Sequence, residues 1–242
     1  MRWFGQSAFL LTDASGARVC IDPFGVPGPA MAARGMRFAY PPIAGVEADL
    51  LLITHEHFDH AAAEVVGGSP RVIRSTAGTL ESPLGPVVAV AAEHDELAGT
   101  RRGPNTLFAF PLDGLRVCHF GDFGQRALRP EQADALGTVD LLFLPVGGGP
   151  TISAVGALAV VLDLRWRNTW EISGRQSLDL MDDGLLVCAS LASAPRRSWA
   201  PGRAGGPGPL RRDGVPPSQP SPRAEQRARR GQGAQRRQRA RG

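Results

Sequence analysis

A short stretch in the first half of the chain gathers the residue types that bind metal ions. His55, His57 and His60 are three of the five histidines in the 242 residues, and Asp59 lies among them. Neutral imidazole and carboxylate groups are the ligands that a zinc-like divalent ion takes in proteins. We therefore predict a metal centre here. The alternative is a solvated polar loop that is rich in histidine by chance.

The elements around this stretch must bring its side chains together. Apolar residues 50–53 lead into it, which predicts a buried strand followed by a ligand-bearing loop. In extended backbone, residues two apart point the same way, so His55 and His57 can converge on one ion. Asp59 and His60 come after the strand, where the chain turns, and can face a second ion.

The spacing H-x-H-x-D-H over residues 55–60 resembles the signature of the metallo-β-lactamase-fold hydrolases. Other segments look more specifically like one branch, the small metal-dependent hydrolases related to ascorbate-6-phosphate lactonase. The likeness covers about residues 1–164 and implies an α/β fold, an αββα sandwich whose C-terminal part is incomplete and disordered. The segments that carry the closer likeness are residues 3–10, 21–24, 121–122 and 144–149.

The resemblance also implies roles for residues outside the histidine-rich stretch. His94 follows an expected strand and would join His55 and His57 on the first ion. Asp122 matches a carboxylate that bridges two ions, and Asp22 matches one that orients a ligand histidine by hydrogen bonding. Taken alone, these three would be a structural histidine and two turn aspartates. The expected metal ligands are His55, His57, Asp59, His60, His94 and Asp122.

Hydrolysis by a metal-bound hydroxide is the chemistry that this ligand set would support. A bound ion lowers the pKa of water from 15.7 to about 7 and polarises the scissile carbonyl or phosphoryl group. Asp59 is the expected catalytic residue, because it would orient the hydroxide while binding the second ion. We expect one or two Zn²⁺ ions, with Mn²⁺ as an alternative, and a small ester, lactone or phosphoester as substrate. His57 stands where diiron redox relatives carry glutamate, which favours hydrolysis.

Three further features keep two interpretations each. His119, inside an apolar run, is a core residue or a support for the ligands. Glycines at 147–149 allow either the close approach of an anion before a helix or a flexible turn. Arg101 and Arg102 meet an anionic substrate or belong to an exposed loop.

The composition limits the remaining functional classes. Hydrophobic residues make up 43% of the chain, as in ordinary globular proteins. No apolar run is long enough for a membrane-spanning helix, and the N-terminus lacks the leader of a signal peptide. Cys20, Cys118 and Cys188 are odd in number and far apart, which argues against a disulfide framework and fits a reducing cytoplasm. We expect a cytoplasmic protein acting on a small molecule, with its oligomeric state left open.

The net charge of +4 conceals two oppositely charged parts. Of the 27 basic residues, all arginine, 16 lie from Arg165 onward, together with only 6 of the 23 acidic residues. The C-terminal part therefore carries +10 and residues 1–164 carry −6. Basic tails bind phosphate backbones, but no aromatic residues are interleaved with the arginines. We therefore expect no nucleic-acid binding beyond a non-specific contribution of the tail.

The chain is predicted to divide into three parts. Residues 1–164 are predicted to form a truncated hydrolase domain, and residues 165–192 are ambiguous, with a possible strand at 185–188 that has no evident partner. Residues 193–242 are dominated by Arg, Pro, Gly, Ala, Ser and Gln, and they are predicted to be disordered because they cannot bury a core.

The likeness to the family ends where one more ligand is expected. Family members place a last ligand histidine beyond the helix that matches residues 152–164, but no histidine follows His119 here. Asp179, Asp182 and Asp183 are conceivable replacements. We hypothesise that the reading frame is shifted near residue 165, which the nucleotide sequence would test. The alternative function is a catalytically impaired or inactive metal-binding relative.

Apolar periodicity and turn residues predict the remaining elements. The predicted elements are a hairpin of residues 2–12 and 17–22, a loop over 23–42, a strand at 48–54, a helix at 61–66, strands at 71–74 and 87–92, a hairpin of 106–110 and 115–120, a helix at 130–136, a strand at 139–145 and a helix at 152–164.

Overall fold

The structure, a computed structural model, describes residues 1–33, 40–166, 178–181 and 185–189. The chain divides into two units, Met1–Gly202 and Arg203–Gly242, and every described residue belongs to the first. The predicted tail at 193–242 and most of the ambiguous segment at 165–192 lie outside the described residues.

The N-terminal half forms a five-stranded sheet in the order β1-β2-β3-β5-β7. The first three strands are antiparallel, whereas β3, β5 and β7 are parallel. Residues 2–12, predicted as one strand, are two, because Gly5 and Gln6 adopt positive φ angles of 118° and 49° and reverse the chain. The strands are β1 (Arg2–Gly5), β2 (Ala8–Thr12), β3 (Arg18–Ile21), β5 (Leu50–Ile53) and β7 (Arg71–Arg74).

The second sheet has seven strands in the order β15-β16-β13-β11-β10-β9-β8. The predicted hairpin around Asp113 and Gly114 is confirmed as β10 and β11. The possible strand at 185–188 exists as β16 and pairs with β13, a partner that the sequence did not reveal. The strands are β8 (Gly78–Leu80), β9 (Val87–Glu93), β10 (Pro104–Leu112), β11 (Leu115–His119), β13 (Leu141–Pro145), β15 (Leu178–Met181) and β16 (Leu185–Ala189).

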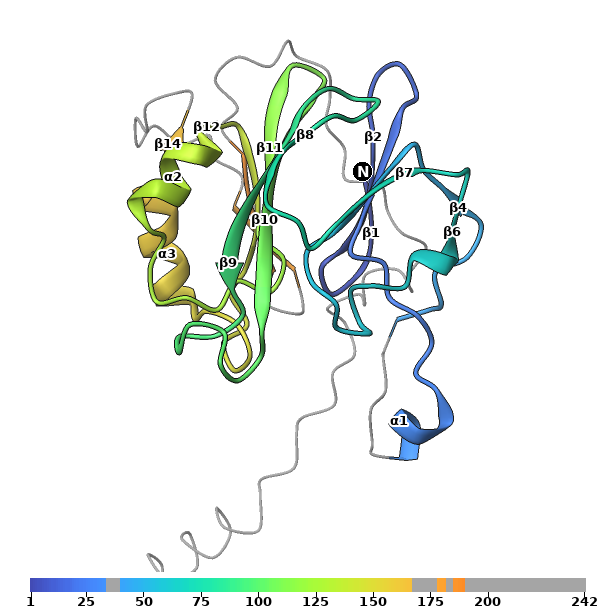
Figure 1. Ribbon diagram of the computed structural model, residues 1–242, viewed down its shortest axis with the longest axis horizontal. Helices are drawn as coiled ribbons and strands as arrows, with labels where there is room; N and C mark the ends of the chain where they lie inside the picture. The colour runs from blue at the N-terminus through green and yellow to red at the C-terminus, as the bar shows by residue number, and fades with distance from the viewer. Residues whose placement is uncertain (34–39, 167–177, 182–184, 190–242) are drawn as a thin grey trace, which may run out of the picture. The chain divides into compact units, whose positions relative to one another are not determined.

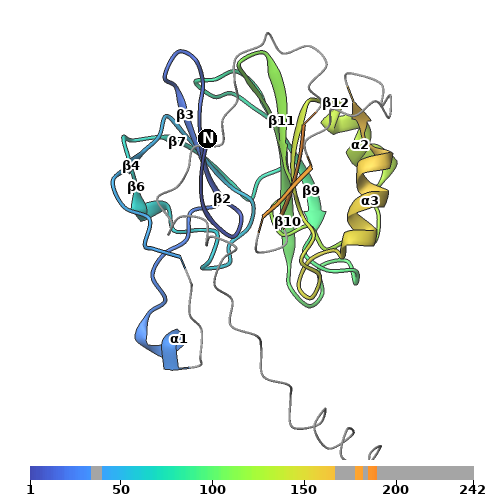
Figure 2. The same cartoon turned by 180° about the vertical axis from the view of Figure 1, so that it is seen from behind.

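The two sheets pack face to face around an apolar core. Phe9 of the first sheet lies 4.5 Å, between ring centroids, from Phe143 of the second. Helices α2 (Pro130–Leu136) and α3 (Ala154–Asp163) cover the other face of the seven-stranded sheet, as both views show (Figures 1 and 2). A short parallel pair, β12 (Thr138–Val139) and β14 (Arg165–Trp166), follows these helices.

The outer face of the five-stranded sheet is covered differently. The helix predicted at 61–66 is wrong: only a 3₁₀ turn, η1 (Ala63–Val65), forms there. Val66 instead pairs with Val46, and the Ala62 N–H donates to the Pro23 carbonyl, so these contacts fix the two ends of the segment and leave room only for the short turn between them. The other elements on this side are β4 (Val46–Glu47) and β6 (Val66–Gly67). Helix α1 (Pro29–Ala33) forms inside the predicted loop and projects away from the sheet (Figure 1).

The predicted αββα sandwich is confirmed, with one outer layer reduced among the described residues to short elements. The expected strand at 48–54 is the fully buried β5, flanked on both sides by parallel strands. Its end and the ends of β9 and β11 carry the predicted ligands. Among the described residues, no helix is both long and apolar enough to cross a membrane.

Candidate metal centre

Three histidines from two different sheets come together as the first part of the site. His55 and His57 follow β5, and His94 follows β9. One ring nitrogen from each lies within 4.8 Å of the other two. The Nε2 atom of His55 is 3.0 Å from the Nδ1 atom of His57. His55 and His94 are buried, so their ring nitrogens face the interior of the site rather than solvent.

The second part of the site joins His60 to two carboxylates. One Asp122 oxygen lies 3.1 Å from Nε2 of His94, and the other lies 3.4 Å from Nε2 of His60. The same nitrogen of His60 is 3.8 Å from an Asp59 oxygen. Asp122 thus stands between the His94 cluster and His60, as a bridging carboxylate would.

Hydrogen bonds fix which nitrogen of each buried histidine is free. The Thr54 hydroxyl donates to Asp22 over 2.7 Å, so its oxygen is left to accept from Nδ1 of His55 at 3.0 Å. Nδ1 of His60 donates to Asp22 at 3.0 Å, and Nδ1 of His94 donates to the Pro150 carbonyl at 3.2 Å. Each ring therefore turns Nε2 toward the centre, and this is the nitrogen with which each histidine would hold a metal.

Asp22 organises this support from a fully buried position. One oxygen accepts the Thr54 N–H at 2.8 Å, and the other accepts the Thr54 hydroxyl and His60 Nδ1. Its φ of 45° is one that aspartate tolerates better than most residues. Burial alone would raise the pKa of the Asp22 carboxyl, but the hydrogen bond and charge of His60 outweigh it and lower that pKa.

The ionisation of the site matches the ligand forms that a cation needs. Burial lowers the pKa of His55 to about 3, so this ring is neutral at pH 7. Burial also lowers the pKa of His57. Burial would raise the pKa of Asp122, but the charge of His60 outweighs it and holds that pKa well below the ordinary value.

The raised pKa of His60 shows that the site carries excess negative charge. Burial lowers the pKa of an imidazole, yet the carboxylates of Asp122 and Asp22 raise the pKa of His60 well above its ordinary value. A positive charge is therefore favoured in this interior position. Two imidazole nitrogens 3.0 Å apart, together with carboxylates, fit a bound divalent cation, because nitrogen ligands of a tetrahedral zinc lie about 3.3 Å apart.

The turn that carries Asp122 is held by residues from neighbouring strands. Asn105 on β10 accepts the Asp122 N–H at 3.2 Å and donates to the Phe120 carbonyl at 2.8 Å. Gly121 has a φ of 53°, and a side chain there would meet Thr54 Oγ1 at 2.5 Å and Asn105 Oδ1 at 2.6 Å. The backbone conformation and the packing both require glycine at this position.

His119 is buried and supports the same turn. Its Nδ1 accepts the Gly121 N–H at 3.1 Å, and its Nε2 donates to the Ser7 carbonyl at 3.1 Å. The ring therefore links the turn before Asp122 to the first sheet. Of the two interpretations from sequence, this contact favours a support for the site.

The one acidic residue of the H-x-H-x-D-H stretch without a predicted role points elsewhere. Glu56 is exposed and accepts hydrogen bonds from Arg74 at 2.6 Å and from the Ser75 hydroxyl at 2.7 Å. It ties the loop to β7. Of the suggested replacements for the last histidine, Asp182 and Asp183 lie outside the described residues, and Asp179 is described only as backbone of β15.

Sequence reasoning missed the residues that hold the ligands from outside. Thr54, Asn105 and Pro150 are common residue types without a recognisable spacing, and each contacts residues that the fold brings near. For Thr54 a weak signal exists, because it lies directly before the first ligand histidine. For Asn105 and Pro150 the contacts span 17 and 56 residues, and no local pattern marks them.

Comparison with known proteins identifies relatives. Residues 1–168 match the model of the β-lactamase superfamily domain. A metal-dependent hydrolase of Thermus thermophilus is 29% identical, over 88% of this chain and 98% of its own length. A metal-dependent hydrolase of Thermococcus kodakarensis is 30% identical, over 70% of this chain and 85% of its own length.

Solved structures give the same result for the fold. A hydrolase of the metallo-β-lactamase superfamily from Thermotoga maritima, assigned as Zn-dependent, is 28% identical with a TM-score of 0.51, covering 70% of this chain and 76% of its own. A protein from Parabacteroides distasonis, 20% identical with a TM-score of 0.52, covers 68% of this chain and 77% of its own and shares the fold.

Proposed function

The chain belongs to the metallo-β-lactamase superfamily, in its branch of small metal-dependent hydrolases, and we propose that it uses zinc to hydrolyse a small ester, lactone or phosphoester. The observation that carries the proposal is the convergence of His55, His57 and His94 beside Asp122 and His60. The Zn-dependence assigned to the Thermotoga relative supports zinc, and Mn²⁺ is the alternative.

The chain's own residues would hold the ions and orient the attacking water. His55, His57 and His94 would hold a first ion, and Asp59 and His60 a second, with Asp122 contacting both. When bound, such ions supply Lewis acidity that polarises a carbonyl or phosphoryl oxygen and lowers the pKa of water. Asp59 would accept a hydrogen bond from the attacking water and orient it. Asp22, Thr54 and the Pro150 carbonyl fix the orientation of the histidine rings through hydrogen bonds.

The second candidate function is a metal-binding relative with impaired catalysis. Of the predicted ligands, Asp59, His60 and Asp122 are placed for a second ion. A catalytic zinc has three protein ligands and an open position for water, and Asp122 is shared between both positions. We therefore expect one ion to be held tightly and the second weakly, and we expect activity to rise when excess Zn²⁺ or Mn²⁺ refills the weak position.

Metal analysis and two matched variants test the proposal. The dialysed protein should retain one equivalent of metal, and Asp59→Ala should keep it while losing activity on generic ester, lactone and phosphodiester substrates by at least about 100-fold. Glu56→Gln is the control, because Glu56 lies in the same loop but contacts Arg74 and Ser75. Two tightly held equivalents of metal would contradict the second candidate function, a relative with impaired catalysis. Absence of metal, or full activity of Asp59→Ala, would contradict the proposed function.

A further inference from the structure

A second feature adjoins the metal centre: an open pocket of about 710 Å³. It is formed by the loops that follow β9, β11 and β13, and we call it the side pocket. It begins one residue beyond His94 and two beyond Asp122, and its wall includes Pro150, whose carbonyl accepts from His94. The lining residues that matter here are Asp95, Glu96, Arg101, Arg102, Arg126 and Pro150.

The charged residues of the side pocket leave two arginines without a carboxylate partner. Glu96 is paired with Arg126 at 2.8 Å. No ion pair is recorded within the described part of the chain for Arg101 or Arg102, and both are exposed. Since guanidinium groups stay charged at all physiological pH values, this side of the pocket is positive although residues 1–164 carry −6 overall.

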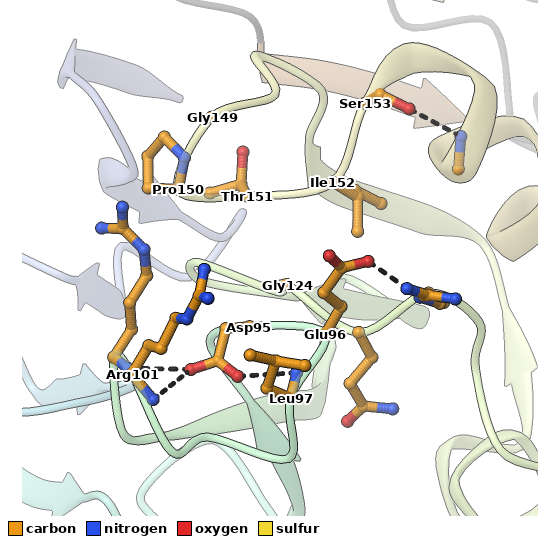
Figure 3. Close-up of a pocket in the computed structure, with 14 residues that line it drawn as sticks. Asp95, Glu96, Leu97, Arg101, Gly124, Gly149, Pro150, Thr151, Ile152 and Ser153 are labelled. Carbon is orange, nitrogen blue, oxygen red and sulfur yellow. Dashed lines mark hydrogen bonds and ion pairs between the residues drawn. The ribbon is translucent and has the colours of Figure 1, made fainter.

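The remaining carboxylate, Asp95, is used to shape the loop. One oxygen accepts the N–H groups of Leu97 and Gly99 at 2.8 and 3.1 Å. The other accepts the N–H groups of Arg101 and Arg102 at 3.0 and 2.8 Å. Figure 3 shows Asp95 and Arg101 on one side of the pocket, opposite Pro150 and Thr151. Asp95 thus presents the two arginines from a fixed backbone instead of neutralising them.

The base of this loop is tied to the metal centre. The His94 N–H donates to the Gly103 carbonyl at 3.1 Å, and the Gly103 N–H donates to the Gly99 carbonyl at 2.8 Å. Gly124, on the neighbouring loop, packs so closely that a side chain there would meet the His94 backbone at 2.4 Å. The side pocket and the ligand His94 therefore keep a fixed relation to each other.

We propose that the side pocket binds an anionic group of the substrate, a phosphate or a carboxylate, through Arg101 and Arg102 while the scissile bond lies at the metal centre. Planar guanidinium groups form paired hydrogen bonds with such oxygens. The start of α3 on the opposite wall adds a favourable partial charge. The inference deepens the proposed function and rests on it: the substrate class becomes a small ester or lactone with a negative charge away from the reacting group.

Anion binding tests the side pocket independently of hydrolysis. Inorganic phosphate and succinate are titrated into the full chain and followed by calorimetry, with the double variant R101A/R102A beside the parent. The two side chains are exposed and the Asp95 contacts use backbone N–H groups, so the loop should keep its form. We expect the double variant to bind the preferred anion about tenfold or more weakly. The control R2A/R71A removes two charges from the first sheet and keeps the affinity of the parent.

Kinetics then identify the anion. The substrates are three aryl esters that differ only in a neutral, carboxylate or phosphate substituent remote from the scissile bond. The parent should prefer one charged ester, and R101A/R102A should reduce the ratio of its kcat/KM to that of the neutral ester about tenfold or more, mainly through KM. The carboxylate and phosphate arms show which group the pocket takes.

The two sets of results separate the failure of this inference from that of the proposed function. Equal anion affinity in the parent and R101A/R102A, absence of anion binding in both, or an unchanged charged-to-neutral ratio overturns the side pocket assignment. Anion binding that depends on Arg101 and Arg102, in a protein that holds metal but cleaves none of the esters, supports the pocket and counts against the hydrolase.

Discussion

At the scale of single residues, Asn105 offers a sharp test of how Asp122 is held. Its amide satisfies the Phe120 carbonyl and the Asp122 N–H, and all three lie inside or at the edge of the core. Asn105→Ala removes both partners, so we expect a loss of about 1–3 kcal/mol in the free energy of unfolding. Because the turn loses its support, metal retained after dialysis should fall as well. Denaturant unfolding and elemental analysis measure the two effects.

A matched variant separates support of the site from support of the fold. Gln132 is also buried, donating to the Ala91 carbonyl at 2.7 Å and to Gln125 at 3.0 Å, and it touches none of the predicted ligands. Gln132→Ala should lower stability by a similar amount and keep the metal. If Asn105→Ala loses stability but holds metal as firmly as Gln132→Ala does, Asn105 has a structural role only.

The predicted ligands could be found from sequence because their chemistry is local. Three histidines and an aspartate within a few residues form a recognisable pattern, and His94 and Asp122 came from the family likeness. The hydrogen-bond partners of these ligands could not be predicted from sequence, because Thr54 and Asn105 act through contacts that exist only once the sheets are stacked. The sequence thus gives candidate donors, but it does not give the tautomers of the histidines.

At the scale of elements, strand β11 carries a prediction about pH. Burial raises the pKa of the Cys118 thiol to about 12, and burial likewise raises the pKa of Cys20 to about 12. Between pH 9 and 12 the folded chain keeps protons that the unfolded chain has released. The contribution of these thiols to stability is therefore complete below pH 9 and lost as the pH rises toward 12. Denaturant unfolding at increasing pH should show this decline.

Thiol labelling at pH 8 checks the same feature directly. In a Cys188→Ala protein, which leaves Cys20 and Cys118, a thiol reagent should label neither cysteine until denaturant is added, since only thiolates react. Cys118→Ala should reduce the alkaline loss of stability. Native labelling at the rate of a free thiol would show that β11 is not packed as described.

Elements with strong periodicity or turn residues were predictable, and short ones were not. The hairpin of β10 and β11 and helix α2 lie where the sequence placed them. Residues 61–66 were assigned to a helix from small residues alone, but the pairing of Val66 with β4 is a contact distant in sequence. The turn at Gln6 was missed because a non-glycine residue with positive φ leaves no signal in the sequence.

At the scale of the whole molecule, the proposed ion would connect the two sheets. His55 and His57 extend from the five-stranded sheet, whereas His94 and Asp122 extend from the seven-stranded sheet. An ion bound only by the folded chain, at 100 times its dissociation constant, adds about 2.7 kcal/mol to the free energy of unfolding. A chelator should therefore lower Tm in the parent, and His55→Ala should lack that response. An equal shift in both proteins would contradict the cross-link.

The position of β16 in the second sheet carries the last prediction. Residues 1–164 were predicted as a truncated hydrolase domain, with residues 165–192 left ambiguous, and β16 at Leu185–Ala189 pairs with β13 along five residues. A chain ending after residue 164 would leave the edge of β13 unpaired, whereas a chain ending after residue 192 keeps β16 and β15. Since residues 193–242 have a composition that offers no core, we expect the longer truncation to melt close to the full chain. The shorter one should melt at least about 5 °C lower, as the loss of about 2 kcal/mol would produce in a domain of this size.

Thermal unfolding of the three proteins, each with matched metal content, measures this. Equal melting of both truncations would show that β16 does not stabilise the sheet, and a large drop after residue 192 would show that the tail does.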